Sequence, residues 1–332
     1  MAQCLITTVP FGERNSFPLE MLKGNDISFL INPYGRKLNE NQLIELVGDG
    51  VEVIIAGTEP ITRKVMEAGS KLRLISRVGI GLDSVDLLAA RDLGIKVSYT
   101  PDAPAPAVAE LTIGLILSLL RGVHVSNLEL HQGNWNRHFG RRIAEVTIGI
   151  IGVGRIGVRV LRRLGAFGTP RILANDLLPN LELSREFKLE WASKEVIYRE
   201  ADVISLHLPL TAQTIGMIGR EEIEEMKPDA LLINTSRGGI IQEKALYDAL
   251  QVGKLGGAAI DVFEQEPYKG PLTSIDRCLL TAHMGSMSLD CRTRMEIEAT
   301  EEAVRFLKGK SLISEVPEEE IAVQEVGSKV TI

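Results

Sequence analysis

The chain has 332 residues, of which 45% are hydrophobic and 24% charged, and its formal net charge at pH 7 is −7. This composition is typical of folded globular proteins and excludes an intrinsically disordered one. The negative charge argues against nonspecific nucleic-acid binding, which depends on neutralised phosphates. The longest apolar run, residues 111–120, falls well short of the ~20 residues of a membrane span, so we expect neither nucleic acid nor membrane as a partner.

The three cysteines, Cys4, Cys278 and Cys291, are scattered and form no C-x-x-C pair that would hold a metal or a redox disulfide. The N-terminus has no basic leader or long apolar core of the kind found in signal peptides and reads as a first strand. We therefore expect reduced thiols, a cytoplasmic location and no metal site.

Up to Pro101 the chain alternates strand-like apolar runs with amphipathic helical segments, two of which are residues 40–47 and 61–68. The predicted strands are residues 5–9, 27–31, 51–56, 72–78 and 95–99. Such alternation predicts a parallel sheet with helices on its faces. Three prolines within residues 101–106 end the pattern, and we place the first domain crossing there.

A long helix is expected at about residues 107–131, and the alternation of strands and helices then resumes. The strands of this second part are predicted at residues 148–151, 171–176, 202–208, 230–234, 257–262 and 279–282. A helix at residues 290–309 would return to the first domain. The glutamate-rich residues that follow have no strong period, so we expect them to be peripheral or mobile, with no folded domain after about Val316.

A G-x-G-x-x-G turn, formed by Gly152, Gly154 and Gly157, follows the apolar run 148–151 and precedes a helical segment. The first glycine permits a tight turn, the second lets the backbone approach a pyrophosphate, and the third lets the helix pack on its strand. Asp176 stands at the end of the next strand, where its carboxylate would accept ribose hydroxyls and repel a 2′-phosphate. The pattern favours NAD, although such a turn also occurs in other α/β proteins and the alternative for Asp176 is that it merely caps a turn.

Three polar residues follow apolar runs late in the chain: Arg237, Glu266 and His283. Open α/β sheets bind ligands beyond the carboxyl ends of their strands. An arginine presents a planar fork of donors that suits the adjacent oxygens of a 2-keto acid, and a histidine exchanges a proton near neutral pH. Singly, each residue is equally explained by an ion pair, a solvated loop or core packing, but their joint pattern favours a site.

These motifs, together with Arg77-Val-Gly-Ile-Gly81, Val108-Ala-Glu110 and His207-Leu-Pro-Leu-Thr211, resemble the D-isomer-specific 2-hydroxyacid dehydrogenases, which include phosphoglycerate dehydrogenase and glyoxylate/hydroxypyruvate reductase. The resemblance implies an α/β fold of two doubly wound parallel-sheet domains. Residues 100–285 would form a Rossmann-type NAD domain inserted into a flavodoxin-like substrate domain, residues 1–99 and 286–332. The active site is expected in the cleft between them.

The same resemblance assigns roles to single residues. Arg237 would bind the substrate carboxylate and carbonyl, His283 would be the general acid/base, and Glu266 its hydrogen-bonded partner. Backbone N–H groups of Ile80 and Gly81 would complete the carboxylate site. Besides the three glycines and Asp176, the expected cofactor contacts are Arg155, Ile156, His207, Pro209, Thr214, Thr235 and Asp261. One departure is Ala282, where the family commonly has proline before the histidine.

The implied function is NAD-dependent interconversion of a small D-2-hydroxy acid and its 2-keto acid, with or without a phosphate group. Phosphoglycerate, hydroxypyruvate and glyoxylate stay open, because basic residues that would meet a phosphate are usually just solvated. Those basic residues are Arg73, Arg77, Lys96 and the cluster 137–142. A homodimer is expected with the helix at residues 107–131 in its interface. The alternative is a dinucleotide-responsive interaction protein of the corepressor type on the same fold.

Overall fold

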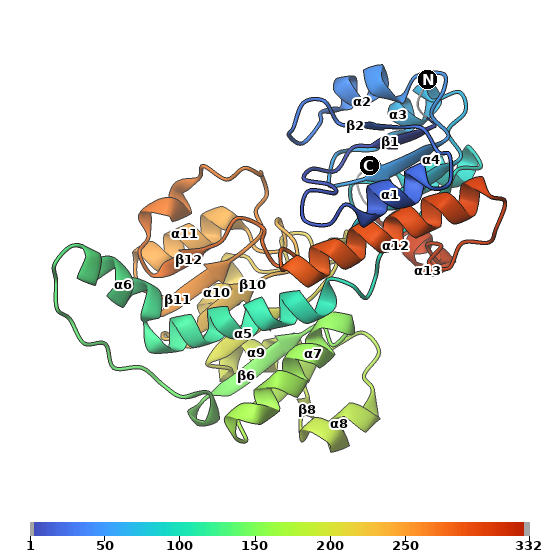
Figure 1. The fold of residues 1–332 in the computed structure, drawn as a ribbon. Coiled ribbons are helices and arrows are strands. Elements are labelled where there is room, and N and C mark those ends of the chain that lie inside the picture. The colour runs from blue at the N-terminus through green and yellow to red at the C-terminus, as the bar shows by residue number, and fades with distance from the viewer. Residues whose placement is uncertain (1–2, 329–332) are drawn as a thin grey trace. The chain divides into compact units, whose positions relative to one another are not determined.

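The computed structural model describes residues 3–328 and divides into two compact units. One unit comprises Met1–Pro104 and Met287–Ile332, and the other comprises Ala105–Ser286. Each unit is built on its own parallel sheet (Figure 1). The α/β class with two parallel sheets, predicted from the alternation of strands and helices, is confirmed.

The first unit contains a five-stranded sheet in the order β2-β1-β3-β4-β5, which is the flavodoxin-like order. Its strands are β1 (Cys4–Ile6), β2 (Phe29–Ile31), β3 (Val53–Ala56), β4 (Leu74–Arg77) and β5 (Lys96–Ser98). All neighbours pair in parallel, with Leu5 opposite Ile54 and Ile54 opposite Ile75. The central strands are buried on both faces, which explains their uninterrupted apolar sequences.

Six helices accompany this sheet: α1 (Phe17–Lys23), α2 (Glu40–Val47), α3 (Arg63–Ala68), α4 (Leu87–Asp92), α12 (Leu289–Leu307) and α13 (Glu318–Ser328). Helix α2 has the predicted bounds, because Asn39 and Gln42 form a capping box that starts it. Helix α3 begins two residues later than predicted, since Ile61 bridges to Val85 and Thr62 serves as the N-cap. The predicted helix at residues 290–309 is confirmed as α12.

The second unit contains a seven-stranded parallel sheet in the order β12-β11-β10-β9-β6-β7-β8. Its strands are β6 (Thr147–Ile151), β7 (Arg171–Asn175), β8 (Glu190–Trp191), β9 (Val203–Leu206), β10 (Leu231–Asn234), β11 (Gly257–Ile260) and β12 (Cys278–Leu280). Six of these strands reproduce the doubly wound dinucleotide-binding order, and β12 extends the edge. The strand order reverses at β6, where ligands of such sheets bind.

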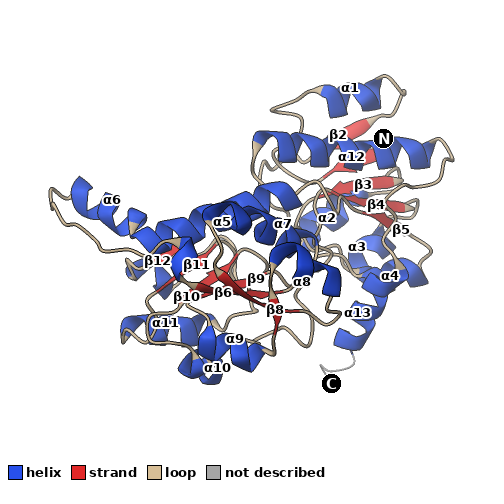
Figure 2. Cartoon of the chain, turned by 90° about the horizontal axis from the view of Figure 1, so that it is seen from below, coloured by secondary structure: helices blue, strands red, loops and turns tan. Residues whose placement is uncertain are grey.

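Helices cover both faces of this sheet, with α5 and α7 on one side and α9, α10 and α11 on the other (Figure 2). The helices are α5 (Ala105–Arg121), α6 (Val123–His131), α7 (Arg155–Leu164), α8 (Leu181–Phe187), α9 (Lys194–Glu200), α10 (Arg220–Glu225) and α11 (Glu243–Gln251). Three short 3-10 turns, η1 (Ile143–Glu145), η2 (Gly165–Phe167) and η3 (Pro271–Ser274), complete the unit. Strand side chains alternate between the two cores, since Ile150 belongs to the α5/α7 core and Ile151 to the other.

The prediction of a single long helix at residues 107–131 is wrong, because two helices, α5 and α6, lie there. Gly122 adopts a left-handed backbone with φ of 60° and separates α5 from α6. Helix α5 buries eight side chains, whereas α6 buries none, so no core holds α6 in line with α5. Within residues 3–328 no single helix has the length and hydropathy of a membrane span, and this pair meets that criterion only jointly, bent by 65°.

The C-terminal residues are more ordered than expected up to Ser328. They form α13, whose Gln324 side chain accepts the Leu87 N–H at 2.9 Å and donates to the Val85 carbonyl at 2.8 Å. These contacts fix α13 against α4. The glutamate-rich composition of the segment gives no sign of them. Residues 329–332, also covered by the expectation of a mobile end, lie outside the described residues.

Candidate active site

The glycine turn after β6 depends on two close backbone approaches. A Cβ on Gly152, whose φ is 93°, would lie 2.3 Å from the carbonyl oxygen of His207. A Cβ on Gly157 would lie 2.2 Å from the carbonyl oxygen of Gly152. No side chain fits at either position, and α7 therefore packs directly on the end of its strand.

Gly154 differs, because a Cβ there would meet nothing within 4 Å. It is the N-cap of the ten-residue helix α7 and supplies no capping side chain, so the backbone N–H groups at Arg155 and Ile156 begin the helix beside open space. An uncapped helix N-terminus next to an open backbone is the arrangement that binds a pyrophosphate. The residues present thus fit a dinucleotide.

Asp176 follows β7 at the predicted place. Its Oδ2 accepts the Val153 N–H at 2.7 Å and its Oδ1 accepts the Leu178 N–H at 3.1 Å. The residue therefore both caps the turn and braces the glycine loop. Each carboxylate oxygen has two lone pairs, so acceptor capacity is left for ribose hydroxyls.

The other expected cofactor contacts differ in exposure. The Nδ1 atom of His207 is buried, Nε2 lies 3.0 Å from the Ser205 hydroxyl, and burial lowers the pKa of the ring to about 4. The Thr214 hydroxyl donates to the Pro209 carbonyl at 2.6 Å and so closes the loop of residues 209–214. Thr235 is buried, with its hydroxyl 2.9 Å from that of Thr112 on α5. Thr235 is thus held within the unit, whereas the buried Nδ1 atom of His207 has no hydrogen-bond partner among the described residues.

The three candidate catalytic residues follow the adjacent strands β10, β11 and β12, so parallel pairing brings them to one edge of the sheet. His283 Nδ1 lies 2.8 Å from Glu266 Oε2, and both side chains are about one-third exposed, at 36% and 30%. The second oxygen of Glu266 accepts the Phe263 N–H at 3.2 Å, which fixes the carboxylate. A proton on Nδ1 donates to this carboxylate and leaves Nε2 for exchange with a substrate.

Arg237 is placed by a side chain that the sequence interpretation missed, Asn234 at the end of β10. The buried Asn234 amide accepts the N–H and hydroxyl of Ser236 and donates to the Arg237 carbonyl at 2.8 Å. The guanidinium itself donates from Nη1 to the Ser236 carbonyl at 2.7 Å. The signal was present, because an Asn between an apolar run and a Thr-Ser pair is typical of a side-chain-stabilised turn.

Ile80 and Gly81 belong to the five-stranded unit and follow β4. Among residues 3–328, neither of their backbone N–H groups has a hydrogen-bond acceptor, and both residues are half-buried. The preceding Gly79 is held by bonds to Thr100, whose hydroxyl accepts the Gly79 N–H at 2.8 Å. The loop therefore presents two free donors on a fixed backbone. No group of three or more His, Cys, Asp or Glu residues in the described chain is arranged to hold a metal ion.

Comparison with known proteins identifies the family of this chain. The family model of the D-isomer specific 2-hydroxyacid dehydrogenase NAD binding domain matches residues 113–285. A hydroxypyruvate reductase of Thermotoga maritima is 36% identical over 276 residues, which cover 81% of this chain and 89% of that protein. A D-3-phosphoglycerate dehydrogenase of Methanocaldococcus jannaschii is 38% identical over 277 residues, which cover 82% of this chain and 53% of that protein. The chain thus spans about half the length of that relative.

Among solved structures, a D-lactate dehydrogenase from Aquifex aeolicus complexed with NAD and lactic acid superposes with a TM-score of 0.82 at 30% identity. The match covers 92% of this chain and 96% of that one. The chain belongs to the D-isomer specific 2-hydroxyacid dehydrogenase family. It is an NAD-dependent oxidoreductase of D-2-hydroxy acids, as the motifs predicted, and the corepressor-like alternative is not favoured.

Proposed function

We propose that Arg237, Glu266 and His283 carry the reaction, which reduces a small 2-keto acid or oxidises the corresponding D-2-hydroxy acid. The observation that carries this proposal is the 2.8 Å contact between His283 Nδ1 and Glu266 Oε2, at the strand edge where Arg237 also lies. A histidine backed by a carboxylate exchanges protons, and a neighbouring guanidinium binds carboxylates. Together these residues supply the two functions that hydride transfer does not provide, which are proton exchange and binding of the substrate carboxylate.

The residues divide the work of reduction among them. Arg237 binds the substrate carboxylate and polarises the carbonyl oxygen through its planar donors. NADH, when bound, supplies the hydride that the carbonyl carbon receives. His283 in its protonated form gives the proton from Nε2 to that carbonyl oxygen, while Glu266 keeps Nδ1 protonated and stabilises the imidazolium. Oxidation reverses these steps, and neutral His283 then takes the hydroxyl proton.

The cofactor contacts and the second carboxylate contact are part of the same proposal. The turn of Gly152, Gly154 and Gly157 would bind the pyrophosphate with the N–H groups at the start of α7, and Asp176 would bind the ribose. Pro209 and Thr214 lie in the loop after β9, the strand next to β6 in the sheet. Ile80 and Gly81 would donate their free N–H groups to the substrate carboxylate.

The substrate class is a small 2-keto or 2-hydroxy acid. Several basic residues considered for phosphate binding are already ion-paired: Arg73 with Glu52, Lys96 with Glu315, Arg141 with Asp202 and Arg142 with Glu145. This pairing favours an unphosphorylated acid such as glyoxylate or hydroxypyruvate. The test is NADH oxidation against glyoxylate, hydroxypyruvate, pyruvate and 3-phosphohydroxypyruvate. Absence of turnover across that panel would refute the proposed function, and a preference for the phosphorylated acid would refute the substrate class.

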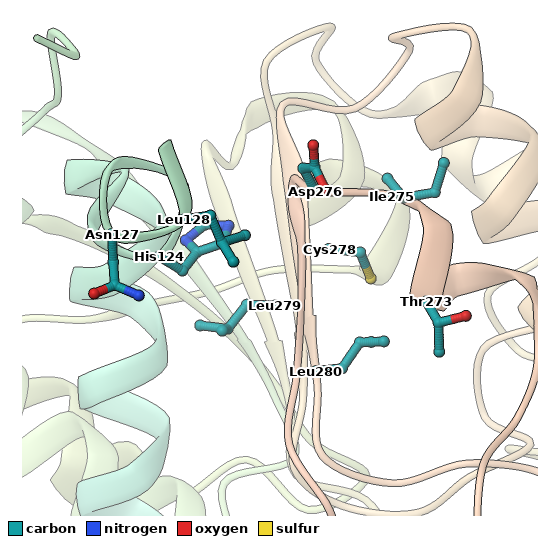
Figure 3. A pocket seen from close by; sticks show the side chains of 9 residues that line it. All are labelled: His124, Asn127, Leu128, Thr273, Ile275, Asp276, Cys278, Leu279 and Leu280. Carbon is teal, nitrogen blue, oxygen red and sulfur yellow. The ribbon is translucent and has the colours of Figure 1, made fainter. Parts of the chain in front are cut away.

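We further propose a homodimer in which α6 lies in the interface. No side chain of helix α6 is fully buried within its own unit, although the ring nitrogens of His124 are covered, and a nine-residue helix with so little packing is marginal in water. Val123, Leu128 and Leu130 are exposed on it, and Trp135 and Phe139 are exposed in the loop that follows. A cavity of about 280 Å³ separates α6 from residues 273–280 (Figure 3). A second copy that covers these side chains supplies the missing packing.

A cytoplasmic location is also proposed, on the state of the cysteines. Cys4, Cys278 and Cys291 are free and buried, and burial raises the pKa of the Cys4 and Cys278 thiols to about 12. Unpaired thiols are the usual state in a reducing compartment. Detection of the native chain in a membrane-free cytoplasmic fraction tests this, and secretion would refute it.

A further inference from the structure

The loop that carries His283 is fastened to the sheet by one buried carboxylate, that of Asp261 at the end of β11. Asp261 is 1% exposed. Its Oδ1 accepts the Thr281 hydroxyl at 2.6 Å and the Met284 N–H at 2.9 Å, and its Oδ2 accepts the Gly285 N–H at 2.9 Å. The three donors flank His283 on both sides, so the carboxylate closes the loop around it.

The backbone of Asp261 adds a further contact. Its carbonyl oxygen accepts the His283 N–H at 2.8 Å, and the Thr281 N–H donates to the Ile260 carbonyl at 3.0 Å. Within residues 3–328 no cation pairs with the Asp261 carboxylate, so the donors of this loop compensate its charge. Burying a carboxylate costs free energy unless hydrogen-bond donors stay in place around it. The loop must therefore keep the shape that holds these donors against Asp261.

That shape is unusual at one residue. His283 has a φ of 48°, in the left-handed region that side chains other than glycine rarely adopt and that surrounding contacts must hold. The preceding Ala282 is exposed and has no ring to restrict the backbone. The direction of the imidazole toward Glu266 therefore depends on what holds the backbone of residue 283.

We propose that Asp261, through Thr281 and the N–H groups of the loop, is a positioning residue that orients His283 toward Glu266. The resemblance had assigned Asp261 to the cofactor, but three of the roughly four acceptor sites of its carboxylate are occupied by the loop. The proposal rests on the proposed function in that His283 is taken as the proton donor. Asp261 acts through His283 and does not itself exchange a proton.

The test compares Thr281→Val, which removes one donor at nearly constant shape, with Thr281→Ser, which keeps it. Asp261→Asn is the second probe, since it places an amide N–H₂ against N–H donors. Thr300→Val is the matched control, because Thr300 is a buried threonine whose hydroxyl bonds only a carbonyl within α12. The readouts are kcat and KM for the 2-keto acid, and NADH affinity by energy transfer from tryptophan. The histidine ring signals are followed by ¹⁵N-histidine NMR, which is tractable with 5 histidines.

We expect Thr281→Val to lower kcat about tenfold, because a small misplacement of the donor is costly, with the NADH dissociation constant changed by less than about twofold. Thr281→Ser should restore most of kcat. The His283 ring signals should move in Thr281→Val and in Asp261→Asn and stay unchanged in Thr300→Val.

Two results would overturn the proposal. One is unchanged kcat and unchanged His283 signals in Thr281→Val. This comparison remains decisive even if Asp261→Asn fails to fold. The other is a loss confined to NADH affinity, which would make Asp261 a cofactor contact alone. A wild-type enzyme without activity on any 2-keto acid would refute the proposed function, whereas the NMR comparison would still decide whether Asp261 orients His283.

Discussion

The backbones of Gly238 and Phe263 are in direct contact, since a Cβ on Gly238 would lie 1.9 Å from the Phe263 carbonyl oxygen. Gly238 comes directly after Arg237, and Phe263 donates its N–H to Glu266. The absent side chain therefore lets the loop of the guanidinium pack on the loop of the carboxylate.

Gly238→Ala should force these two loops apart and lower both stability and kcat. Overpacking at a site with no room typically costs about 1–3 kcal/mol. The 2 tryptophans, Trp135 and Trp191, both lie in this unit, so tryptophan fluorescence during heating reports its unfolding. Gly165→Ala is the control, because a Cβ there meets nothing within 4 Å and its φ of −57° is helical. Equal behaviour of the two variants would contradict the close contact.

His283→Ala should lose most turnover and keep cofactor binding. Removal of a general acid typically lowers kcat by about 10²–10⁴-fold, and the glycine turn does not depend on the imidazole. Steady-state NADH absorbance gives kcat, and energy transfer from tryptophan to NADH gives the dissociation constant. A kcat within about threefold of the wild type would remove His283 as the proton donor.

Arg237→Lys tests whether the guanidinium acts by geometry or by charge. Lysine keeps the charge but not the pair of planar donors, so kcat/KM for glyoxylate should fall roughly 100-fold, with unchanged NADH affinity. Arg237→Ala should lower kcat/KM for glyoxylate further. A lysine variant that matches the wild type would show that charge alone suffices, and an equal loss of NADH affinity would place Arg237 at the cofactor instead.

The pH dependence of stability should carry the signature of His207. Burial lowers its pKa in the folded state to about 4, below the ordinary value of 6.5. As pH falls from 6.5 toward 4, the unfolded chain binds a proton at this residue and the folded chain does not. The free energy of unfolding of the seven-stranded unit should therefore fall by up to about 3 kcal/mol. Above pH 6.5 the residue contributes no pH dependence.

His207→Gln removes this titration and keeps an amide near the Ser205 hydroxyl. Urea midpoints measured by tryptophan fluorescence at pH 4.5 and 7.5 should differ less in this variant than in the wild type. Equal differences in the two proteins would show that His207 does not titrate in this range.

Leu130→Glu should dissociate the proposed homodimer. Leu130 is 56% exposed on α6, and a carboxylate there would be buried without a partner in the interface. Light scattering during gel filtration should give a wild-type mass of twice the 36.4 kDa chain and a variant mass near 36.4 kDa. Leu181→Glu on α8, where Leu181 is 71% exposed, is the control and should stay dimeric. A monomeric wild type would refute the homodimer.

Much of the architecture can be predicted from the sequence because parallel strands buried on both faces leave uninterrupted apolar runs, such as β3 and β9. Capping residues add sharp helix starts, as at Asn39. The break at Gly122 could not be predicted, because a glycine inside a helical pattern is tolerated when the helix has a core to pack on. Whether residues 123–131 have such a core is a tertiary property.

The site follows the same division. The candidate residues Arg237, Glu266 and His283 can be predicted from the sequence, because each follows an apolar run and parallel strands end at one edge of the sheet. The hydrogen bond between Thr281 and Asp261 joins residues 20 apart on neighbouring strand ends and leaves no local spacing to detect. Likewise, Thr235 bonds Thr112 on α5, so its side chain is directed by a helix 123 residues earlier in the chain.

The imidazole, its carboxylate, the guanidinium and the glycine turn all belong to Ala105–Ser286, on a single sheet. The five-stranded unit supplies none of these groups. Substitutions at the proposed substrate contacts of that unit, Ile80 and Gly81, should therefore leave the imidazole, its carboxylate and the guanidinium unchanged. The groups proposed to exchange the proton and to bind the dinucleotide are thus encoded by one uninterrupted stretch of the chain, whereas the other unit is assembled from both ends of the sequence.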